Sequence, residues 1–149
     1  METNRRQLAV ICTGICMAVG LAGCGQSAPS VDFAKVHGTV RVNGKPQRAI
    51  QVLFVPDAEK GIKLPALAGA ETDDQGNYSL KYSYHNKTGE GAPVGWNRAV
   101  LSDMSVGIPR GGQPAKPSAI PPVYGSSAST PLLKEVKPGD NTIDLEVQK

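Results

Sequence analysis

The sequence has few aromatic residues, few cysteines and little excess charge, and each of these shortages excludes certain kinds of core or classes of protein. Aromatic residues make up 5% of the 149 residues, so a hydrophobic core must consist mainly of Val, Ile and Leu. Sixteen Lys and Arg stand against 13 Asp and Glu, and a net charge of +3 gives no electrostatic basis for binding nucleic acid. Charged residues are 19%, which fits neither a disordered tail nor a polytopic membrane protein.

The sequence also lacks the period of an amphipathic helix in its second half, whereas glycine and proline are abundant. The chain contains 17 Gly and 12 Pro, which disfavour a helical bundle and suit tight turns between short strands. A chain of this length has room for one small domain. The composition therefore indicates one β-rich domain.

The first part of the chain has the pattern of an export signal. Arg5 and Arg6 form a basic start, and residues 8–21 then run without a charge. As a helix this run would span about 21 Å, which is shorter than the ~30 Å hydrocarbon core of a bilayer. We therefore expect a signal peptide rather than a permanent spanning helix. A twin-arginine export signal is an alternative for the paired arginines, although its other residues are missing.

The apolar run ends at a four-residue motif made of Leu21, Ala22, Gly23 and Cys24. This motif resembles the lipobox of bacterial lipoproteins, in which an apolar residue and two small residues precede a cysteine. The resemblance implies that a signal peptidase recognises the first three residues and cuts before Cys24. It also implies that the Cys24 thiol carries a diacylglyceryl group and that the new amino terminus is acylated, with chains such as palmitate. Two or three acyl chains would hold the protein on a membrane.

The predicted cleavage would leave a mature chain with a single cysteine, the lipidated Cys24. The other two, Cys12 and Cys16, lie in the leader, so no thiol remains for a disulfide, a zinc site or a nucleophile. We expect residues 1–23 to be the signal peptide and residues 24–34 to be the lipidated cysteine and a flexible tether. Residues 35–149 then form the domain, located in the cell envelope on the inner or outer membrane and facing the periplasm or the exterior.

Seven short runs in the domain alternate between apolar and polar residues or are bounded by turn residues. They predict strands at residues 36–42, 49–55, 66–72, 77–84, 96–102, 132–136 and 142–147. Residues 49–55 are apolar on nearly both faces, which predicts a central strand between two layers. The pattern predicts an all-β fold, an antiparallel β-sandwich of about seven strands.

Two segments resemble a known family. Residues 36–40 (VHGTV) followed by Asn43-Gly44, and residues 69–80 with Asp73 and Gly76, are similar to the carboxypeptidase regulatory-like, or transthyretin-like, β-sandwich. The resemblance covers roughly residues 35–148 and implies a non-catalytic accessory module. Physical chemistry gives the second segment a structural role as well, because Asp73 can accept backbone N–H bonds and Gly76 can adopt a positive φ.

A long connection, residues 103–129, departs from this family pattern. Nine of its residues are Gly or Pro, and a loop of this length in a compact domain is usually functional or disordered. We expect residues 104–116 to be a mobile insertion. The apolar side chains of residues 120–124 are expected to pin the other half to the sandwich.

The search for catalytic or metal-binding chemistry gives little. His37 falls on the polar side of a predicted strand and His85 begins a loop, so they are not expected to share a site. Acidic residues in the loops offer a calcium site as an alternative to solvated turn residues; they are Asp57, Glu59, Asp73, Asp74 and Asp103. We expect no enzyme activity, no cofactor and no metal.

Aromatic residues supply the remaining candidates. Tyr78, Tyr82 and Tyr84 alternate onto one face of a predicted strand and belong to the core if that face points inward. We expect Tyr84 and Tyr124 to be the more exposed, and together with Trp96 they could stack on a sugar.

Two functions follow from these residues. We expect a membrane-anchored envelope lipoprotein whose β-sandwich is a structural or protein-interaction module for an unidentified envelope protein. The alternative is a module that binds a carbohydrate or small ligand through exposed aromatic residues and the loop at 103–129.

The lipid anchor gives the first testable prediction. Cys24→Ser removes the only sulfur that could carry the diacylglyceryl group, so the variant should be unlipidated and no longer held on the membrane. Mass spectrometry of the mature amino terminus measures this directly. A wild-type protein that still begins at Met1, or that carries an unmodified Cys24, would contradict the prediction.

Overall fold

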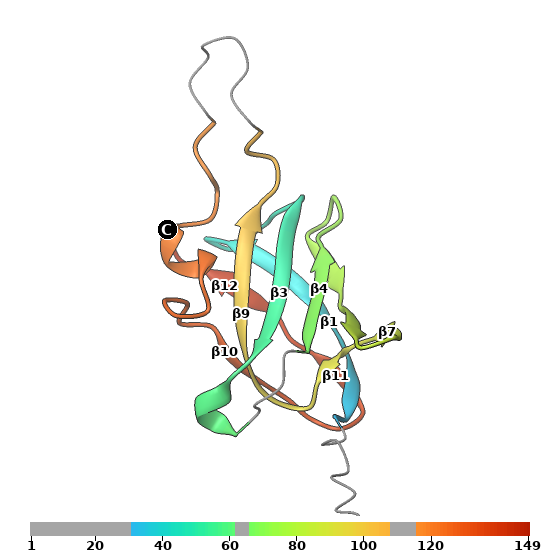
Figure 1. Ribbon diagram of the computed structural model, residues 1–149. Helices are drawn as coiled ribbons and strands as arrows, with labels where there is room; N and C mark the ends of the chain where they lie inside the picture. The colour runs from blue at the N-terminus through green and yellow to red at the C-terminus, as the bar shows by residue number, and fades with distance from the viewer. Residues whose placement is uncertain (1–30, 62–65, 108–115) are drawn as a thin grey trace, which may run out of the picture.

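The computed structural model describes residues 31–61, 66–107 and 116–149, and in these ranges the chain is a β-sandwich of two packed sheets (Figure 1). The predicted lipobox, Leu21 to Cys24, lies outside the described residues. None of the helices in the described ranges is long and apolar enough to cross a membrane. The predicted all-β class and two-layer sandwich are confirmed.

The first sheet, called here the β1 sheet, is built around one long strand. Its members are β1 (Phe33–Val42), β2 (Lys45–Pro46), β5 (Asn77–Ser79), β8 (Ala92–Pro93), β11 (Asp140–Thr142) and β12 (Leu145–Val147). Strands β8, β5 and β2 pair with β1 in antiparallel fashion. Strands β11 and β12 pair with it in parallel. The sandwich is antiparallel as predicted except at these two strands, which the chain reaches by a crossover from the other sheet.

The second sheet, called the β3 sheet, has the order β10-β9-β3-β4-β6-β7 and is antiparallel throughout. Its strands are β3 (Ile50–Pro56), β4 (Leu67–Glu71), β6 (Lys81–Tyr84), β7 (Lys87–Glu90), β9 (Gly95–Asp103) and β10 (Leu133–Val136). Two short 3₁₀ helices, η1 (Ala58–Lys60) and η2 (Pro122–Gly125), lie in the connections.

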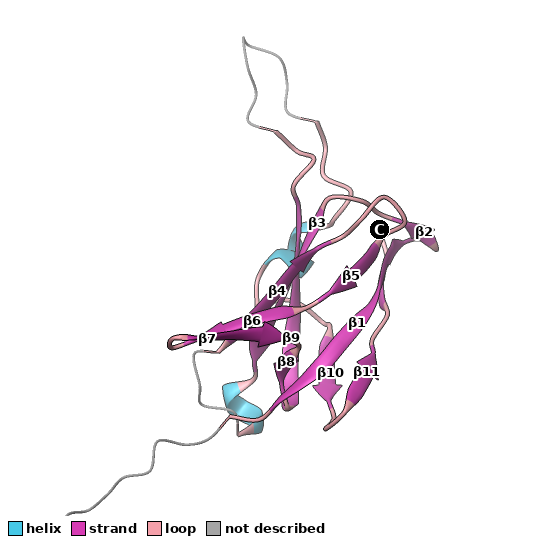
Figure 2. Cartoon of the chain, turned by 90° about the vertical axis from the view of Figure 1, so that its right-hand side faces the viewer, coloured by secondary structure: helices cyan, strands magenta, loops and turns pink. Residues whose placement is uncertain are grey.

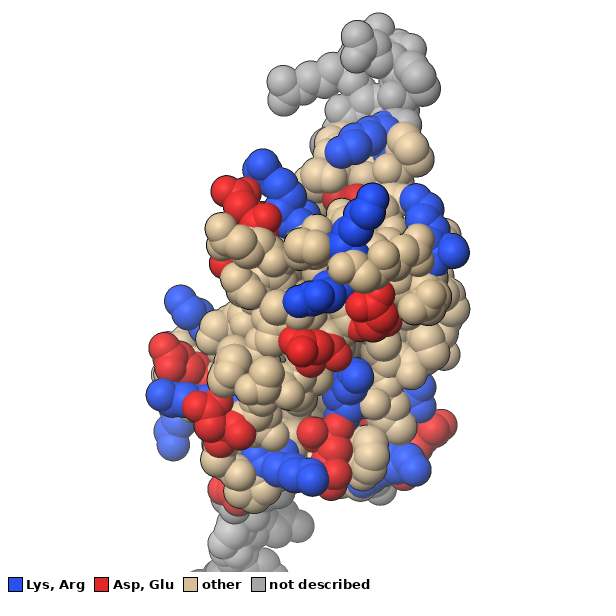
Figure 3. Space-filling model, turned by 180° about the vertical axis from the view of Figure 1, so that it is seen from behind, with Lys and Arg blue, Asp and Glu red and all other residues tan. Residues whose placement is uncertain are grey.

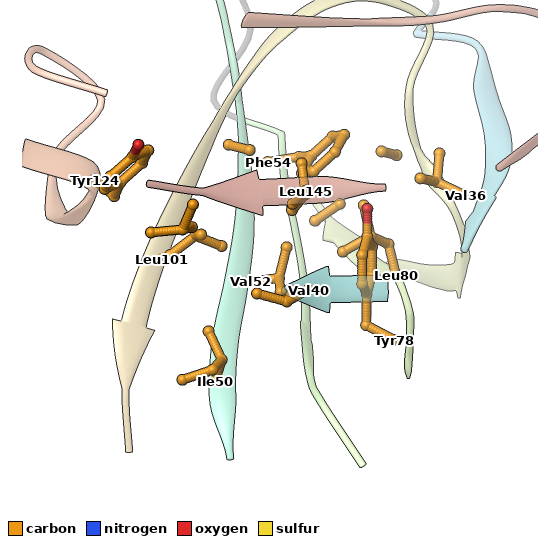
Figure 4. Close-up of a cluster of buried hydrophobic side chains, with 14 of the residues drawn as sticks. Val36, Val40, Ile50, Val52, Phe54, Tyr78, Leu80, Leu101, Tyr124 and Leu145 are labelled. Atoms are coloured by element: carbon orange, nitrogen blue, oxygen red, sulfur yellow. The ribbon is translucent and has the colours of Figure 1, made fainter. Parts of the chain in front are cut away.

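The core lies between the two sheets and is made mainly of aliphatic side chains, as the low aromatic content predicted (Figure 4). β1 supplies alternate residues to it and leaves the others exposed, which is the period-2 pattern of a strand with one covered face. The largest fully buried side chains include Phe54, Ile50, Leu80, Leu101 and Leu145.

The predicted strand at 77–84 is one run in sequence but two strands in space. β5 pairs with β1, and β6 pairs with β4 in the other sheet. The change of sheet falls at Leu80, which is fully buried and whose N–H donates to the carbonyl of Val36 (2.9 Å). The turn before it is as predicted: Asp73 Oδ1 accepts from the N–H groups of Gln75 and Asn77, and Gly76 has a φ of 79°.

Between β11 and β12, Ile143 and Asp144 lie outside the two strands. The N–H of Ile143 still donates to the carbonyl of His37 (2.8 Å), and side chains supply further bonds. Asp144 Oδ1 accepts from both the N–H and the hydroxyl of Thr39, each at 2.8 Å, and these bonds hold the pKa of Asp144 below its usual range. The carbonyl of Ile143 accepts from the Tyr78 hydroxyl at 2.6 Å. Burial raises the pKa of Tyr78 well above its ordinary value, so this hydroxyl stays a donor.

The long connection is pinned in its second half, as predicted. Ile120 and Tyr124 are buried and belong to the hydrophobic core. The Asp103 carboxylate accepts from the N–H of Ala119 (2.8 Å), which ties the end of β9 to the returning chain. The predicted mobile insertion at 104–116 falls largely on residues 108–115, which lie outside the described residues.

Gly38 is the tightest point of the β1 sheet and gives the second prediction. A β-carbon at this position would overlap the carbonyl group of Ile143, which is backbone and cannot rotate away. Gly38→Ala should therefore lower the free energy of unfolding by about 1–3 kcal/mol or more, measured by chemical denaturation. Gly107→Ala is the matched control because no atom of the described residues lies within 4 Å of its added β-carbon, apart from its own chain neighbours. Equal stability of the two variants would contradict the described pairing of β1.

Candidate functional site

Three aromatic rings meet where β1 begins, one from β1 and two from β6. The ring of Phe33 stacks on that of Tyr82 from β6, with centroids 3.7 Å apart and planes 15° apart. The Tyr84 ring lies 6.2 Å from Phe33 at 48°. These contacts connect the β1 sheet to the β3 sheet. We call this group, with the tip of the β6–β7 hairpin, the aromatic edge.

Gly89 of β7 makes room for one of these rings. It pairs with Tyr82 across the hairpin, and a β-carbon built on it would lie 2.7 Å from the Tyr82 hydroxyl oxygen. Tyr82 is therefore held between Phe33, which covers a face of its ring, and Gly89, which lies against its hydroxyl end. The absence of a side chain at position 89 therefore leaves the space that this ring occupies.

The hairpin tip carries a ring, an imidazole and a cation close together. His85 has a φ of 51°, and its ring meets that of Tyr84 edge to face at 4.3 Å. Lys87 is the cross-strand partner of Tyr84. In Figure 2 this hairpin extends sideways from the sandwich. A cleft of about 450 Å³ lies here, lined by Val31, Phe33, Tyr82, Tyr84, His85, Asn86 and Lys87.

The structure does not bring the three predicted aromatic candidates together. Tyr84 lines this cleft, half-buried. Tyr124 is 7% exposed, so its expected exposure is wrong: η2 places its ring in the core, where its hydroxyl accepts a 3.3 Å bond from the N–H of Gln148 (Figure 4). Trp96 is 37% exposed on β9, with Lys60 Nζ 6.0 Å from its ring.

Trp96 belongs to a second surface, the outward face of the β3 sheet. β3 and β9 point alternate residues outward, and Leu53 on β3 is the direct cross-strand partner of Val100 on β9. Both are only half-buried, as is Val55, and Leu67 on β4 is 45% exposed. We call this set the outer apolar face. The prediction of a central strand for residues 49–55 is therefore confirmed within the sheet, but their outward side chains are only half-buried, so no second layer of the described residues covers that face fully.

The opposite surface of the sandwich has a different chemistry. The outward residues of β1 are Lys35, His37, Thr39 and Arg41. Lys35 forms an ion pair with Glu90 (3.7 Å), and His37 Nδ1 lies 3.2 Å from Asp140. Lys, Arg, Asp and Glu are interspersed over the view from behind (Figure 3). The two outer surfaces of the sandwich therefore differ, one polar and one with apolar residues at its centre.

The loop acids proposed for calcium each have a local partner. Asp57 is nearly buried and accepts from Arg98 Nε at 3.1 Å, and Asp74 pairs with Arg48 at 3.5 Å. Hydrogen bonds from Asn77 lower the pKa of Asp73. At Asp103, bonds from Ser105 and Ala119 outweigh the effect of burial, so its pKa is also lowered. In the described ranges no group of three His, Cys, Asp or Glu side chains could hold a metal ion.

Sequence reasoning missed two parts of the aromatic edge. Phe33 fell in the segment expected to be a tether, and the chain after His85, which was expected to begin a loop, contains β7 and β8. A signal for the hairpin was present, because His85-Asn86 is a two-residue connection with an asparagine, which favours a tight turn. Nothing in the sequence alone links Phe33 to Tyr82, since that contact joins different sheets.

The sequence matches no protein-family model, and comparisons with curated proteins and with solved structures found no match. A functional assignment therefore depends on the residues and surfaces described above.

Proposed function

We propose that the protein is a bacterial envelope lipoprotein, held on a membrane through Cys24, whose non-catalytic β-sandwich is a protein-interaction module. The observation that carries the proposal is the outer apolar face, where Leu53, Val55, Val100 and Leu67 lie together with Trp96 nearby on the same side of one sheet. The corresponding surface of the β1 sheet is polar. Neighbouring apolar residues that remain partly exposed and are rimmed by polar ones are typical of interaction sites.

The composition of this face fits a protein partner. Trp and Arg are enriched among residues that dominate binding energy, and Trp96 and Arg98 both point outward from β9. Arg98 is held by Asp57 and Glu59, at 3.1 and 3.5 Å, so its side chain is already ordered before a partner binds. An ordered side chain loses less conformational entropy on binding.

The lipoprotein and family parts of the proposal depend on sequence motifs. The lipobox-like motif at residues 21–24 supports the anchor. The Asp73–Gly76 turn, which leads into the buried Tyr78, supports similarity to the carboxypeptidase regulatory-like sandwich, because each residue has the structural role that the motif requires. In that family the sandwich is an accessory module, which agrees with a binding role rather than a catalytic one.

The interaction surface can be tested by site-specific crosslinking in cells. A photoreactive amino acid replaces Leu67 on the outer apolar face in one variant, and Ser79 on the exposed polar face in the other. Irradiation should give a discrete adduct from position 67 and none from position 79, detected by immunoblotting. Adducts of the same size and yield from both positions would show that the apolar face has no special role.

The substitution Leu67→Glu tests the same surface by disrupting binding of the partner. Position 67 is already 45% exposed, so the substitution should change the free energy of unfolding by little. It should reduce by at least tenfold an adduct formed from a photoreactive residue placed at Val100. An undiminished adduct from this variant would contradict the proposed surface.

A further inference from the structure

We propose that the aromatic edge is a membrane-contacting surface, at which Tyr84 and Lys87 enter the headgroup layer of the bilayer that carries the anchor. The inference rests on the proposed lipidation of Cys24. It adds an orientation: the hairpin tip faces the membrane, and the far end of the sandwich faces away. The outer apolar face is left free for a protein partner.

Covalent geometry places the aromatic edge close to the anchor. Val31 lines the cleft and follows Cys24 by seven residues, which span at most about 25 Å when fully extended. The carbonyl of Asp32 accepts from the N–H of Val94 at 2.9 Å, so the chain is fixed in the fold right at the cleft. β9 runs away from this end of the sandwich (Figure 1), and its nine residues measure about 30 Å. Met104 directly follows its last residue and so lies at the far end.

The side chains of the aromatic edge match the chemistry of a membrane interface. Tyrosine is enriched there because its ring is apolar and its hydroxyl is polar. Lys87, directly across the hairpin from Tyr84, can lay its apolar stem along the ring while its ammonium group reaches lipid phosphates. His85 and Asn86 are exposed at the turn and add polar groups beside the ring. The tip thus presents one apolar ring among polar and cationic groups.

Because the anchor already holds the domain at the bilayer, a weak contact between the hairpin and the lipids is enough to orient the domain. Once Cys24 is in the bilayer, contact between the hairpin and the same membrane is intramolecular, with an effective concentration in the millimolar range or above. A small surface can therefore fix the orientation of the domain, although it would not bind a membrane by itself.

A carbohydrate is the rival occupant of this cleft, and the ring geometry disfavours it. Stacking on a sugar needs free ring faces, but Phe33 and Tyr82 cover each other at 3.7 Å. The hydroxyl end of Tyr82 also lies against Gly89. Tyr84 is left as a single ring, and His85 already contacts it edge to face. One partly occupied ring suits an interfacial contact better than a sugar platform.

The experiment compares two variants, each with a single tryptophan, which lies at one end of the domain in the first variant and at the other end in the second. The two variants are Trp96→Phe with Tyr84→Trp and Trp96→Phe with Met104→Trp, each as the mature chain. Each is bound to phosphatidylethanolamine–phosphatidylglycerol vesicles through the native anchor. In parallel, each unlipidated chain is attached through a maleimide lipid to Cys24, which is the only thiol after residue 23. A fraction of the lipids carries a spin label on the headgroup, which quenches nearby tryptophan.

We expect the fluorescence emission of the tryptophan at position 84 to shift to shorter wavelength and to be quenched at least twofold by the labelled lipid. The emission of the tryptophan at position 104 should be unaffected. Lys87→Glu in the position-84 variant should reduce the quenching. Equal responses at both positions would overturn the inference, and so would an emission change at position 84 caused by soluble peptidoglycan fragments but not by vesicles. If the natural chain does not float with vesicles while the maleimide-coupled chain shows the expected quenching, the proposed anchor is wrong and the membrane-facing edge stands.

Discussion

The pairing of β1 on both sides is the constraint on which the rest of the sandwich depends. This one strand is bonded to five others, three antiparallel along one side and two parallel along the other. Its partners lie far apart in sequence; Thr39, for example, is bonded to Asp144, 105 residues away. The domain has no thiol in its described ranges to fix such distant segments covalently. The bonds and buried side chains of β1 must therefore hold the two ends of the domain together.

Much of the fold could be predicted because local patterns decide it. The alternation in β1, the long apolar run of β3 and the Asp73–Gly76 turn all depend on neighbouring residues, and each forms the strand or turn that was expected. Prediction of the strand pairing fails where contacts between residues distant in sequence determine it. Leu80 divides one alternating run between two sheets, and the parallel pairing of β11 and β12 with β1 has no local signal.

At the candidate site, too, local features could be predicted from the sequence and contacts between distant residues could not. The sequence identified Tyr84, but it could not show that Phe33 stacks on Tyr82, that Gly89 makes room for that ring, or that η2 buries Tyr124. These facts depend on which sheets face each other. The sequence also could not show that the second face of β3 is only partly covered, because an apolar run looks the same whether its second face packs on a helix or stays partly exposed.

The two proposals assign different surfaces to different partners. The start of β1 lies where the chain arrives from the proposed anchor, and the further proposal therefore assigns the aromatic edge to the membrane. The outer apolar face lies on the broad side of the β3 sheet and remains accessible to a protein in the envelope. Both arrangements require β1 to be held firmly, because it fixes where the chain enters the sandwich and carries the sheet on which the β3 sheet packs.

Native-state hydrogen exchange, followed residue by residue by NMR, tests this dependence on β1 most directly. If β1 holds the sandwich together, the hydrogen-bonded amides of Thr39 and Val40 should exchange only through global unfolding, with the free energy obtained from chemical denaturation. If these amides instead exchange by local opening at a much lower free energy, while those of β3 and β9 stay protected, β1 is a peripheral strand and the account is wrong.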